Sequence, residues 1–391
     1  MRTNELRHEI AVFSSFDEVA DRWTALEQRG LHTPFQTLPW CRTLMEKVGG
    51  GAEPVLVVVT DRDGRDLMLL PLVRRQRNRL MVIEFIDFGY SDYNAPLLGT
   101  PHAIDADYMK TLWQAILEAL PAADTLHLDK QPEQIGGVAN PLVGLVGSRP
   151  VKLMSHGVAL PEKWADFHEV VLSKRTAKSI RQQGRRLARA GKVTFIHSRE
   201  GEKAAEQLFD GLVELRIARF AKLGRDEPLL DDGVRSFYRS MVSAGKAMMM
   251  GIKVDGEIIA VLYGLVEGRS FSLLILAMAS GDWEKYSPGL VMVESGMAHL
   301  HKTGFRYFDF TIGGERYKRQ FGADDRTLFE VRRSLSFRGL PDAVLQNLRY
   351  SASRNATARQ LVDAYRNLVA SLTRKPDGDA EVSEAHTDQA A

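Results

Sequence analysis

A short stretch near the C-terminus contains residue types that could do acid–base chemistry. Residues 307–322 read YFDFTIGGERYKRQFG, an apolar run with one acid that breaks at two glycines and continues as a charged helix. In a strand, alternation places Asp309 on one face together with Tyr307 and Thr311. Aspartate is disfavoured in strands, and its buried charge is costly unless it is paired. Asp309 is therefore either compensated structurally, by Lys318, Arg316 or a turn amide, or it has a shifted pKa and serves as a base for an incoming amine or hydroxyl.

A second group of chemically useful residues lies in the middle of the chain. Residues 172–192 read LSKRTAKSIRQQGRRLARAGK and carry eight cations and no acid. Small and apolar residues at spacings of three and four form a narrow stripe, which predicts a docked helix with its cations on the open faces. Those cations are either a solvated charged face or an anion site for cofactor phosphates, an acidic glycan or an RNA end. The absence of interleaved aromatic residues gives little support to stacking of single-stranded nucleic acid. The substrate-binding candidates on this helix are Arg175 and Arg181.

Residue counts and spacing disfavour other kinds of site. Cys41 is the single cysteine, which excludes an internal disulfide and a cysteine-based zinc cluster. His299 and His301 are two residues apart on a predicted helix and point away from each other, so we expect no metal site. The sequence contains neither a GxxxxGK[ST] phosphate loop nor a GxSxG nucleophile elbow. Direct transfer of a group to a bound acceptor is therefore favoured over a covalent enzyme intermediate.

The composition is typical of an ordinary soluble protein. The hydrophobic content is 44%, and 52 Lys+Arg against 50 Asp+Glu leave a formal charge of +2, so bulk binding to a polyanion is not implied. The N-terminus MRTNELRHEI is too charged for a signal peptide, and the apolar runs fall short of the ~20 residues that cross a bilayer. We therefore expect a cytoplasmic protein without a transmembrane segment. Residues 373–391 lack the apolar side chains needed for order and are expected to be disordered.

The elements that must position these residues occur in the same order twice. Apolar runs flank Asp63-Gly64 in the first half and Asp255-Gly256 in the second, and both dipeptides are strong hairpin signals. Each hairpin follows two helix-like stretches and precedes a strand, a loop, a helix and a last strand. This order predicts an α/β fold of the α+β type with two tandem domains, each a mixed central sheet flanked by helices. We place the N-terminal domain at 1–165, the C-terminal domain with the basic helix at 166–340, and closing helices at 341–372.

The last strand and helix resemble a known family motif. FDFTIGGERYKRQFG is similar to the DFxxGDExYKxxW signature of the CelD/BcsL-type members of the GNAT acyltransferase superfamily. The segments TPFQTLPW, LLPLV, SDYNAPLL and SPGLVMVESGMAHLHK resemble other recurring parts of that family, from about residue 10 to about residue 340. Gly314, Arg316 and Phe321 stand where the family usually has an acid, a proline and a tryptophan. The matching residues are Asp309, Phe310, Gly313, Glu315, Tyr317 and Lys318.

This resemblance implies a tandem GNAT-like protein with a thioester donor. In GNAT-like enzymes the fourth strand offers its backbone to a pantetheine arm, and here that strand is RSFSLLILAM. The next helix begins near Ser287, where free N–H groups and the helix dipole favour phosphate. The resemblance implies acetyl-CoA, another acyl-CoA or a similar thioester carrier as the donor, and the sequence departs from the family in lacking the usual Gln/Arg-x-x-Gly-x-Gly/Ala loop. The residues expected to bind it are Leu276, Ala277, Met278, Ser287, Gly289 and Leu290.

The resemblance also suggests catalytic roles. Tyr317 lies where many GNAT enzymes keep a tyrosine that protonates the leaving sulfur, and Asp309 or Glu315 is the candidate base. Lys318 could hold a phosphate or carboxylate of the acceptor. We expect Asp309 and Tyr317 to lie together at the mouth of one cleft. The first-half residues that could face the same cleft are Asp92 and Tyr93.

Three interpretations of the function stay open. The leading one is an acyltransferase that acts on an amine or hydroxyl of a small molecule, a sugar or an envelope-polysaccharide acceptor, and the family name suggests exopolysaccharide or cellulose biosynthesis. The second is a Fem-type aminoacyl transferase that uses charged tRNA, because Fem-type enzymes also pair two GNAT-like domains and join basic helical segments to them. The third is a catalytically silent GNAT-like scaffold in a polysaccharide-synthesis assembly.

Overall fold

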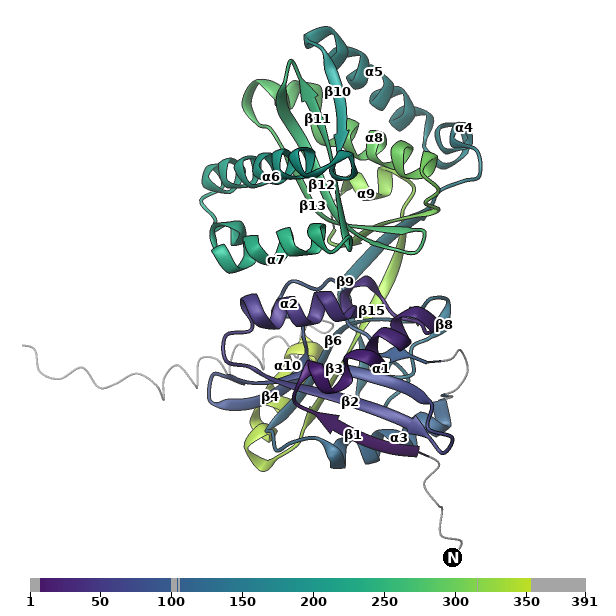
Figure 1. The fold of residues 1–391 in the computed structure, drawn as a ribbon, viewed down its shortest axis with the longest axis vertical. Coiled ribbons are helices and arrows are strands. Elements are labelled where there is room, and N and C mark those ends of the chain that lie inside the picture. The colour runs from purple at the N-terminus through teal and green to yellow at the C-terminus, as the bar shows by residue number, and fades with distance from the viewer. Residues whose placement is uncertain (1–7, 100–103, 105, 315, 353–391) are drawn as a thin grey trace, which may run out of the picture. The chain divides into compact units, whose positions relative to one another are not determined.

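The computed structural model describes residues 8–99, 104, 106–314 and 316–352. Residues 1–335 form one compact unit and residues 336–391 a second (Figure 1). The described part of the second unit contains a 3-10 turn, Phe337–Gly339, and the helix α10, Leu340–Ala352, so a predicted closing helix is present. Glu315, residues 353–372 and the predicted disordered tail lie outside the described residues. The domain bounds given above stay predictions.

The first half contains the predicted order of elements, preceded by an edge strand that the sequence pattern did not indicate. Its helices are α1 (Phe16–Arg29), α2 (Leu38–Val48) and α3 (Ala106–Ala119), with a 3-10 turn at Pro34–Gln36. Its strands are β1 (His8–Phe13), β2 (Glu53–Asp61), β3 (Asp66–Arg77), β4 (Leu80–Phe85), β5 (Leu97–Leu98) and β6 (Thr125–Pro132). A small separate hairpin follows, formed by β7 (Gln134–Ile135) and β8 (Val138–Ala139).

The second half repeats this order. Its strands are β10 (Val193–His197), β11 (Ala247–Val254), β12 (Glu257–Glu267), β13 (Ser270–Met278) and β14 (Tyr307–Ile312). Its helices are α6 (Glu202–Lys222), α7 (Asp232–Ser243), α8 (Pro288–Lys302) and the short α9 (Arg316–Gln320), with a 3-10 helix, η5, at Gly281–Tyr286. Between the halves lie the strand β9 (Ser148–Ala159), the short helix α4 (Trp164–Asp166), a π turn at Phe167–Val171 and the basic helix α5 (Lys174–Ala190); β15 (Asp324–Ser334) ends the unit.

Local sequence explains several of these boundaries. Ser15 and Glu18 form a capping box that starts α1, because each side chain accepts a hydrogen bond from the other residue's backbone N–H. The hydroxyl of Ser173 accepts from the N–H of Thr176 and starts α5. Asp255-Gly256 turns β11 into β12 with positive φ at both residues, as the predicted hairpin requires.

One mixed sheet runs through both halves, in the order β1-β2-β3-β4-β6-β15-β9-β14-β13-β12-β11-β10, with β5 paired to β3. The two strands at its centre are exchanged between the halves. β9, which follows the first half in sequence, pairs with β14 of the second half, whereas β15, which follows the second half, pairs with β6 of the first (Figure 1). β9 and β15 also pair with each other in antiparallel orientation. The fold is therefore a tandem pair of mixed sheets whose last strands connect them.

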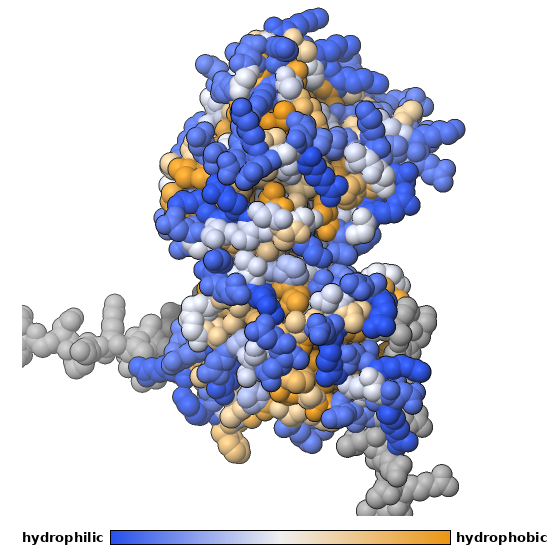
Figure 2. All heavy atoms as spheres, viewed as in Figure 1, coloured by the Kyte–Doolittle hydropathy of each residue, from blue (hydrophilic) through white to orange (hydrophobic). Residues whose placement is uncertain are grey.

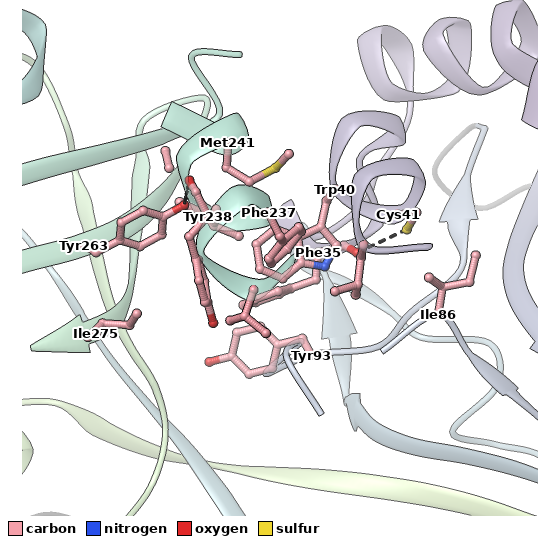
Figure 3. Packing of buried hydrophobic residues seen from close by; sticks show 14 of the residues in the cluster. Phe35, Trp40, Cys41, Ile86, Tyr93, Phe237, Tyr238, Met241, Tyr263 and Ile275 are labelled. Atoms are coloured by element: carbon pink, nitrogen blue, oxygen red, sulfur yellow. Dashed lines mark hydrogen bonds between the residues drawn. The ribbon is translucent and has the colours of Figure 1, made fainter. Parts of the chain in front are cut away.

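Aromatic packing joins the two halves away from the sheet. Trp40 of α2 meets Phe237 of α7 edge to face at 4.7 Å, and Tyr238 packs edge to face against Tyr263 of β12 at 5.2 Å (Figure 3). All four side chains are buried. Each aromatic pair of this kind adds about 0.5–1.5 kcal/mol beyond the apolar area that it buries. Hydrophilic side chains cover much of the visible surface (Figure 2).

Candidate active site

β13 and β14 are parallel neighbours that diverge early. They pair at three positions, of which the last joins Ser272 to Asp309. β13 continues from there to Met278 without a further register pair to β14 among the described residues. Residues 274–278 therefore form an open edge of β13 that begins next to Asp309.

The open edge of β13 carries three of the residues that were predicted to bind the acyl donor. The N–H of Ala279 donates to the carbonyl of Ile259 in β12 at 2.8 Å, so strand alternation turns the amides of Met278 and Leu276 away from β12. Ala277 is buried, whereas the side chains of Leu276 and Met278 are partly buried against the core under α8. Amides that lack a strand partner can pair with the amides of an extended ligand.

Local turn bonds hold the start of α8. The N–H of Ser287 donates to the carbonyl of Glu284, and the N–H of Leu290 donates to the carbonyl of Ser287, both at 3.0 Å. Gly289 is buried under Met278, and a Cβ added at Gly289 would lie 2.7 Å from the Met278 Cε. Local turn bonds therefore occupy the N–H groups of Ser287 and Leu290, and the phosphate site at this helix start stays a prediction.

Asp309 lies where the two halves meet inside the unit. Its Oδ1 accepts a hydrogen bond from the Tyr93 hydroxyl at 2.8 Å and another from the N–H of Thr311 at 2.7 Å. Thr311 has a φ of +58°, a strained value for a β-branched residue, and this backbone twist aims its N–H at the carboxylate. The structure thus brings together Asp309 and Tyr93, two residues that the sequence analysis placed at one cleft. Burial raises the pKa of Asp309, and these two hydrogen bonds offset part of the rise.

Asp92 joins the same group of residues. Burial raises its pKa from 3.8 to about 6, the negative charge of Asp309 adds to the rise, and a hydrogen bond to Thr311 together with Lys130 and Lys318 opposes it. The Lys130 ammonium is itself held by the Ser91 carbonyl at 2.7 Å. Two acids with raised pKa values in one buried group are suited to receive a proton near neutral pH.

The structure separates Tyr317 from Asp309. Phe310 lies on the opposite face of β14 from Asp309 and is buried in the core under α8, and the Tyr317 ring packs edge to face against it at 5.9 Å. Lys318 is buried, and its ammonium donates to the Ile312 carbonyl at 2.6 Å. The expectation that Asp309 and Tyr317 share one cleft mouth is therefore wrong, because the turn at Gly313 sends α9 back over the other face of the sheet.

The two predicted arginines of the basic helix lie apart from Asp309. Arg175 and Arg181 are exposed on α5, and neither lines the cavity described below. α5 packs against α8 and η5, so it neighbours the end of the open edge of β13. The Arg186 guanidinium lies 5.8 Å from the Tyr286 ring centroid at that junction. Figure 2 shows hydrophilic side chains over this helix.

A cavity of about 690 Å³ opens beside Asp309. Its floor is the central part of the sheet, where Tyr307 lies over Gly157 so closely that a Cβ at that glycine would overlap the phenol oxygen. Ser155 and Ser272, both buried, add hydroxyl groups to the wall. The remaining lining comes from residues 32–34 and 132–137 of the first half, from Glu267 and Ser270 of the second half, and from residues 325–327 of β15. A volume of this size falls in the range of small-molecule sites.

Sequence reasoning missed most of this cavity. Strand alternation places Tyr307 on the same face as Asp309, but the sequence pattern indicates no role for it. Arg326 and Ser155 meet only because β15 pairs with β9, where the two residues are directly opposite. An unexplained glycine in a strand, Gly157, is the one signal of close approach that the sequence offered.

Comparisons with known proteins agree with this architecture. Residues 174–319 match the family model described as an acetyltransferase (GNAT) domain. The matched segment runs from the start of α5 into α9 and is similar to a GNAT domain. No curated protein matches the chain. Among solved structures, FemX is similar at 13% identity and a TM-score of 0.57, covering 82% of this chain and 96% of that one.

Two further solved structures share the fold. The C-terminal DUF2156 domain of a putative lysylphosphatidylglycerol synthetase from Agrobacterium fabrum has 15% identity and a TM-score of 0.50, covering 81% of this chain and 91% of that one. A conserved protein of unknown function from Bacteroides thetaiotaomicron has 9% identity and a TM-score of 0.51, covering 82% and 99%. Identities this low establish a shared fold and leave the activity, the donor and the acceptor open. Within the described residues, no helix is both long and apolar enough to span a membrane.

Proposed function

We propose that this chain is an acyltransferase that passes an acyl group directly from a thioester donor to an amine or hydroxyl. The observation that carries the proposal is the divergence of β13 and β14 at the pair Ser272–Asp309. It sets an edge of unpaired amides on one side of Asp309 and a polar cavity on the other. An extended donor arm along residues 274–278 would bring its thioester to the acceptor held in that cavity.

The acidic group supplies the proton transfers of this reaction. The acceptor nitrogen or oxygen attacks the thioester carbonyl carbon and gives up its proton to Asp309, which lines the cavity, or through Asp309 to Asp92, which does not. The carbon–sulfur bond then breaks, the sulfur leaves with the bonding electron pair, and the protonated carboxyl group returns the proton to it. The products are an amide or ester and a free thiol. A carboxylate with a raised pKa holds the proton more readily during the attack than an ordinary aspartate does.

The proposal also names the type of GNAT protein, the acceptor and the donor. The match of Asp309, Phe310, Tyr317 and Lys318 to the CelD/BcsL signature favours that type of GNAT protein. The hydroxyl-lined cavity favours a small, polar acceptor related to sugars or envelope polysaccharides. Acetyl-CoA or another acyl-CoA is the proposed donor, with backbone pairing at Leu276 and Met278.

Thiol release tests the proposal. Purified protein is incubated with a panel of acyl-CoAs and with mixed amine and hydroxyl acceptors, and free thiol and acylated products are measured. We expect acceptor-dependent thiol release that falls by at least about a hundredfold in Asp309→Asn, because removal of a general base costs roughly 10²–10⁴-fold. Asp226→Asn changes an exposed aspartate in the loop after α6 and is the matched control. Equal rates in all three proteins would refute the proposal.

A second candidate is aminoacyl transfer from a charged tRNA. The observation that favours it is the cationic face of α5 beside η5 and α8. In the part of the chain that the structure describes, Lys174, Arg175, Lys178 and Arg181 are exposed and form no ion pair, so their charges are free to meet phosphates. A tRNA ester would place its acyl group at the same open edge of β13, with oxygen as the leaving atom.

Filter binding of bulk tRNA at several salt concentrations separates the two candidates. Aminoacyl transfer predicts binding that weakens steeply with salt, and Arg175→Glu with Arg181→Glu should flatten that slope by about two to four. Acyl-CoA transfer predicts thiol release that these substitutions leave unchanged. If neither donor is used and Asp309→Asn leaves the cellular phenotype intact, the remaining interpretation is a non-catalytic scaffold.

A further inference from the structure

The floor of the cavity is set by three adjacent strands. Asp309 of β14 is opposite Gly157 of β9, and Gly157 is opposite Asp324 of β15. Arg326 is two residues beyond Asp324 and therefore lies on the same face of the sheet. From strand spacing and rise, the Cα atoms of Asp309 and Arg326 are about 12 Å apart. Their side chains thus flank the same patch of floor, which the Tyr307 ring covers.

Carboxylates outnumber cations around this floor. Of the lining side chains, those of Glu133, Glu267, Asp309 and Asp325 are acids, and Arg326 is the one guanidinium. Asp325 already pairs with Arg319 at 2.8 Å, outside the cavity. Within the described residues, no lysine or arginine forms an ion pair with the other three acids. A polar cavity with this excess of negative charge favours an ammonium group.

Arg326 is the one cation among these acidic lining residues, and its guanidinium is open to a ligand. It is exposed, and it forms no ion pair in the described part of the chain. Its guanidinium lies 5.0 Å from the centroid of the Tyr307 ring, a contact that fixes it over the floor without using its N–H donors. The hydrogen bonds from Tyr93 and Thr311 both end on Oδ1 of Asp309, so Oδ2 stays open to a cation of the acceptor. A planar guanidinium held in this way is suited to bind a carboxylate or phosphate through two hydrogen bonds.

We infer that the acceptor is an amine that also carries an anionic group, its nitrogen directed to Asp309 and its carboxylate or phosphate to Arg326. The inference rests on the proposed acyl transfer and names the class of acceptor. The two side chains line one cavity whose floor is the Tyr307 ring over Gly157, so the amine and the anionic group belong to one small molecule. A free amino acid and a phosphorylated amino sugar both satisfy this chemistry. The remaining volume of the cavity accommodates the rest of either molecule.

Matched ligand pairs test the inference without any donor. Calorimetric titration of the full chain compares glucosamine 6-phosphate with glucosamine, and L-alanine with L-alaninamide, at millimolar concentration. In each pair the amine is kept and only the anionic group changes. We expect one anionic member to bind about tenfold to a hundredfold more tightly than its neutral partner, which is the contribution of hydrogen bonds to charged groups. The pair that shows the preference identifies phosphate or carboxylate as the group recognised.

Variants assign the preference to Arg326. Arg326→Ala should abolish it, Arg326→Lys should keep part of it, and Arg225→Ala, which removes an exposed arginine in the loop after α6, should leave it intact. Equal affinity within both pairs, loss of the preference in the Arg225 variant, or no binding by any of the four compounds would overturn the inference. The proposed acyl transfer fails by a different result, the absence of thiol release from every acyl-CoA. The two failures are therefore distinguishable.

Discussion

Replacing Asp92 by asparagine tests whether burial of the Asp92 carboxylate lowers the stability of the folded chain. The folded chain raises the pKa of Asp92 from 3.8 to about 6, chiefly by burial. Asparagine has nearly the shape of the protonated acid but never ionises. The substitution therefore mimics the form of Asp92 that the folded chain prefers.

The expected effect depends on pH, and its sign follows from linkage. Below about pH 3.8 the carboxyl group is protonated in both states, and the stability linked to the raised pKa is fully present. That stability is lost as the pH rises through 6, because the folded chain must then bury a carboxylate that the unfolded chain hydrates. The loss from 3.8 to 6 amounts to about 3 kcal/mol at 1.36 kcal/mol per pH unit. Asp92→Asn is therefore expected to be more stable than wild type by up to about 3 kcal/mol at pH 8, and equally stable near pH 4.

Urea unfolding at pH 4, 6 and 8 measures this difference. At roughly 2 °C per kcal/mol for a unit of this size, Tm at pH 8 should rise by about 6 °C. Asp226→Asn, at an exposed position, should change neither the unfolding free energy nor Tm. Catalysis should change in the opposite direction, because the variant lacks an acid–base group and loses the limb of kcat/KM near pH 6. A variant that is less stable at pH 8, or whose stability difference is the same at every pH, would refute the reasoning.

Two further substitutions probe the hydrogen bond to Asp309 and the cavity floor. Tyr93→Phe removes a hydrogen bond to a charged group, worth about 1.5–3 kcal/mol, so the pKa of Asp309 should rise further. The acid limb of kcat/KM is then expected to move up by about one to two pH units, and an unchanged profile would contradict the assigned contact. Gly157→Ala forces the Tyr307 ring off the floor and should cost about 1–3 kcal/mol of unfolding free energy in urea titrations. Gly144→Ala, where a Cβ meets open space, should cost less, and equal losses would count against the close contact.

Much of the fold follows from local patterns. The Asp-Gly hairpins, the capped helices and the repeated order of elements depend on turn chemistry and on spacing within about ten residues, which the sequence shows directly. The edge strand β10 escaped notice because its five residues, VTFIH, are too short to display a period. The family resemblance also suggested that Asp92 and Tyr93 face the same cleft as Asp309, and the hydrogen bond between Tyr93 and Asp309 agrees with it.

The orientation of the residues after β14 required the tertiary structure. Tyr317 is eight positions from Asp309, and a single glycine turn decides which face of the sheet it joins. Gly313 has a φ of +124°, a value open to glycine and unfavourable for other residues, and α9 follows it onto the core side. The motif alone shows which residues are present, whereas backbone direction determines which of them meet.

The sequence by itself determined the elements, their order and the acid on β14, because these depend on neighbours along the chain. The tertiary structure alone decided that β9 and β15 change partners, and this exchange brings Gly157 and Arg326 to Asp309. Pairing between strands 150 residues or more apart leaves no signal in the local sequence, because any strand edge with a matching burial pattern could pair with the same strand. The cavity is therefore a property of the assembled sheet and of no single segment.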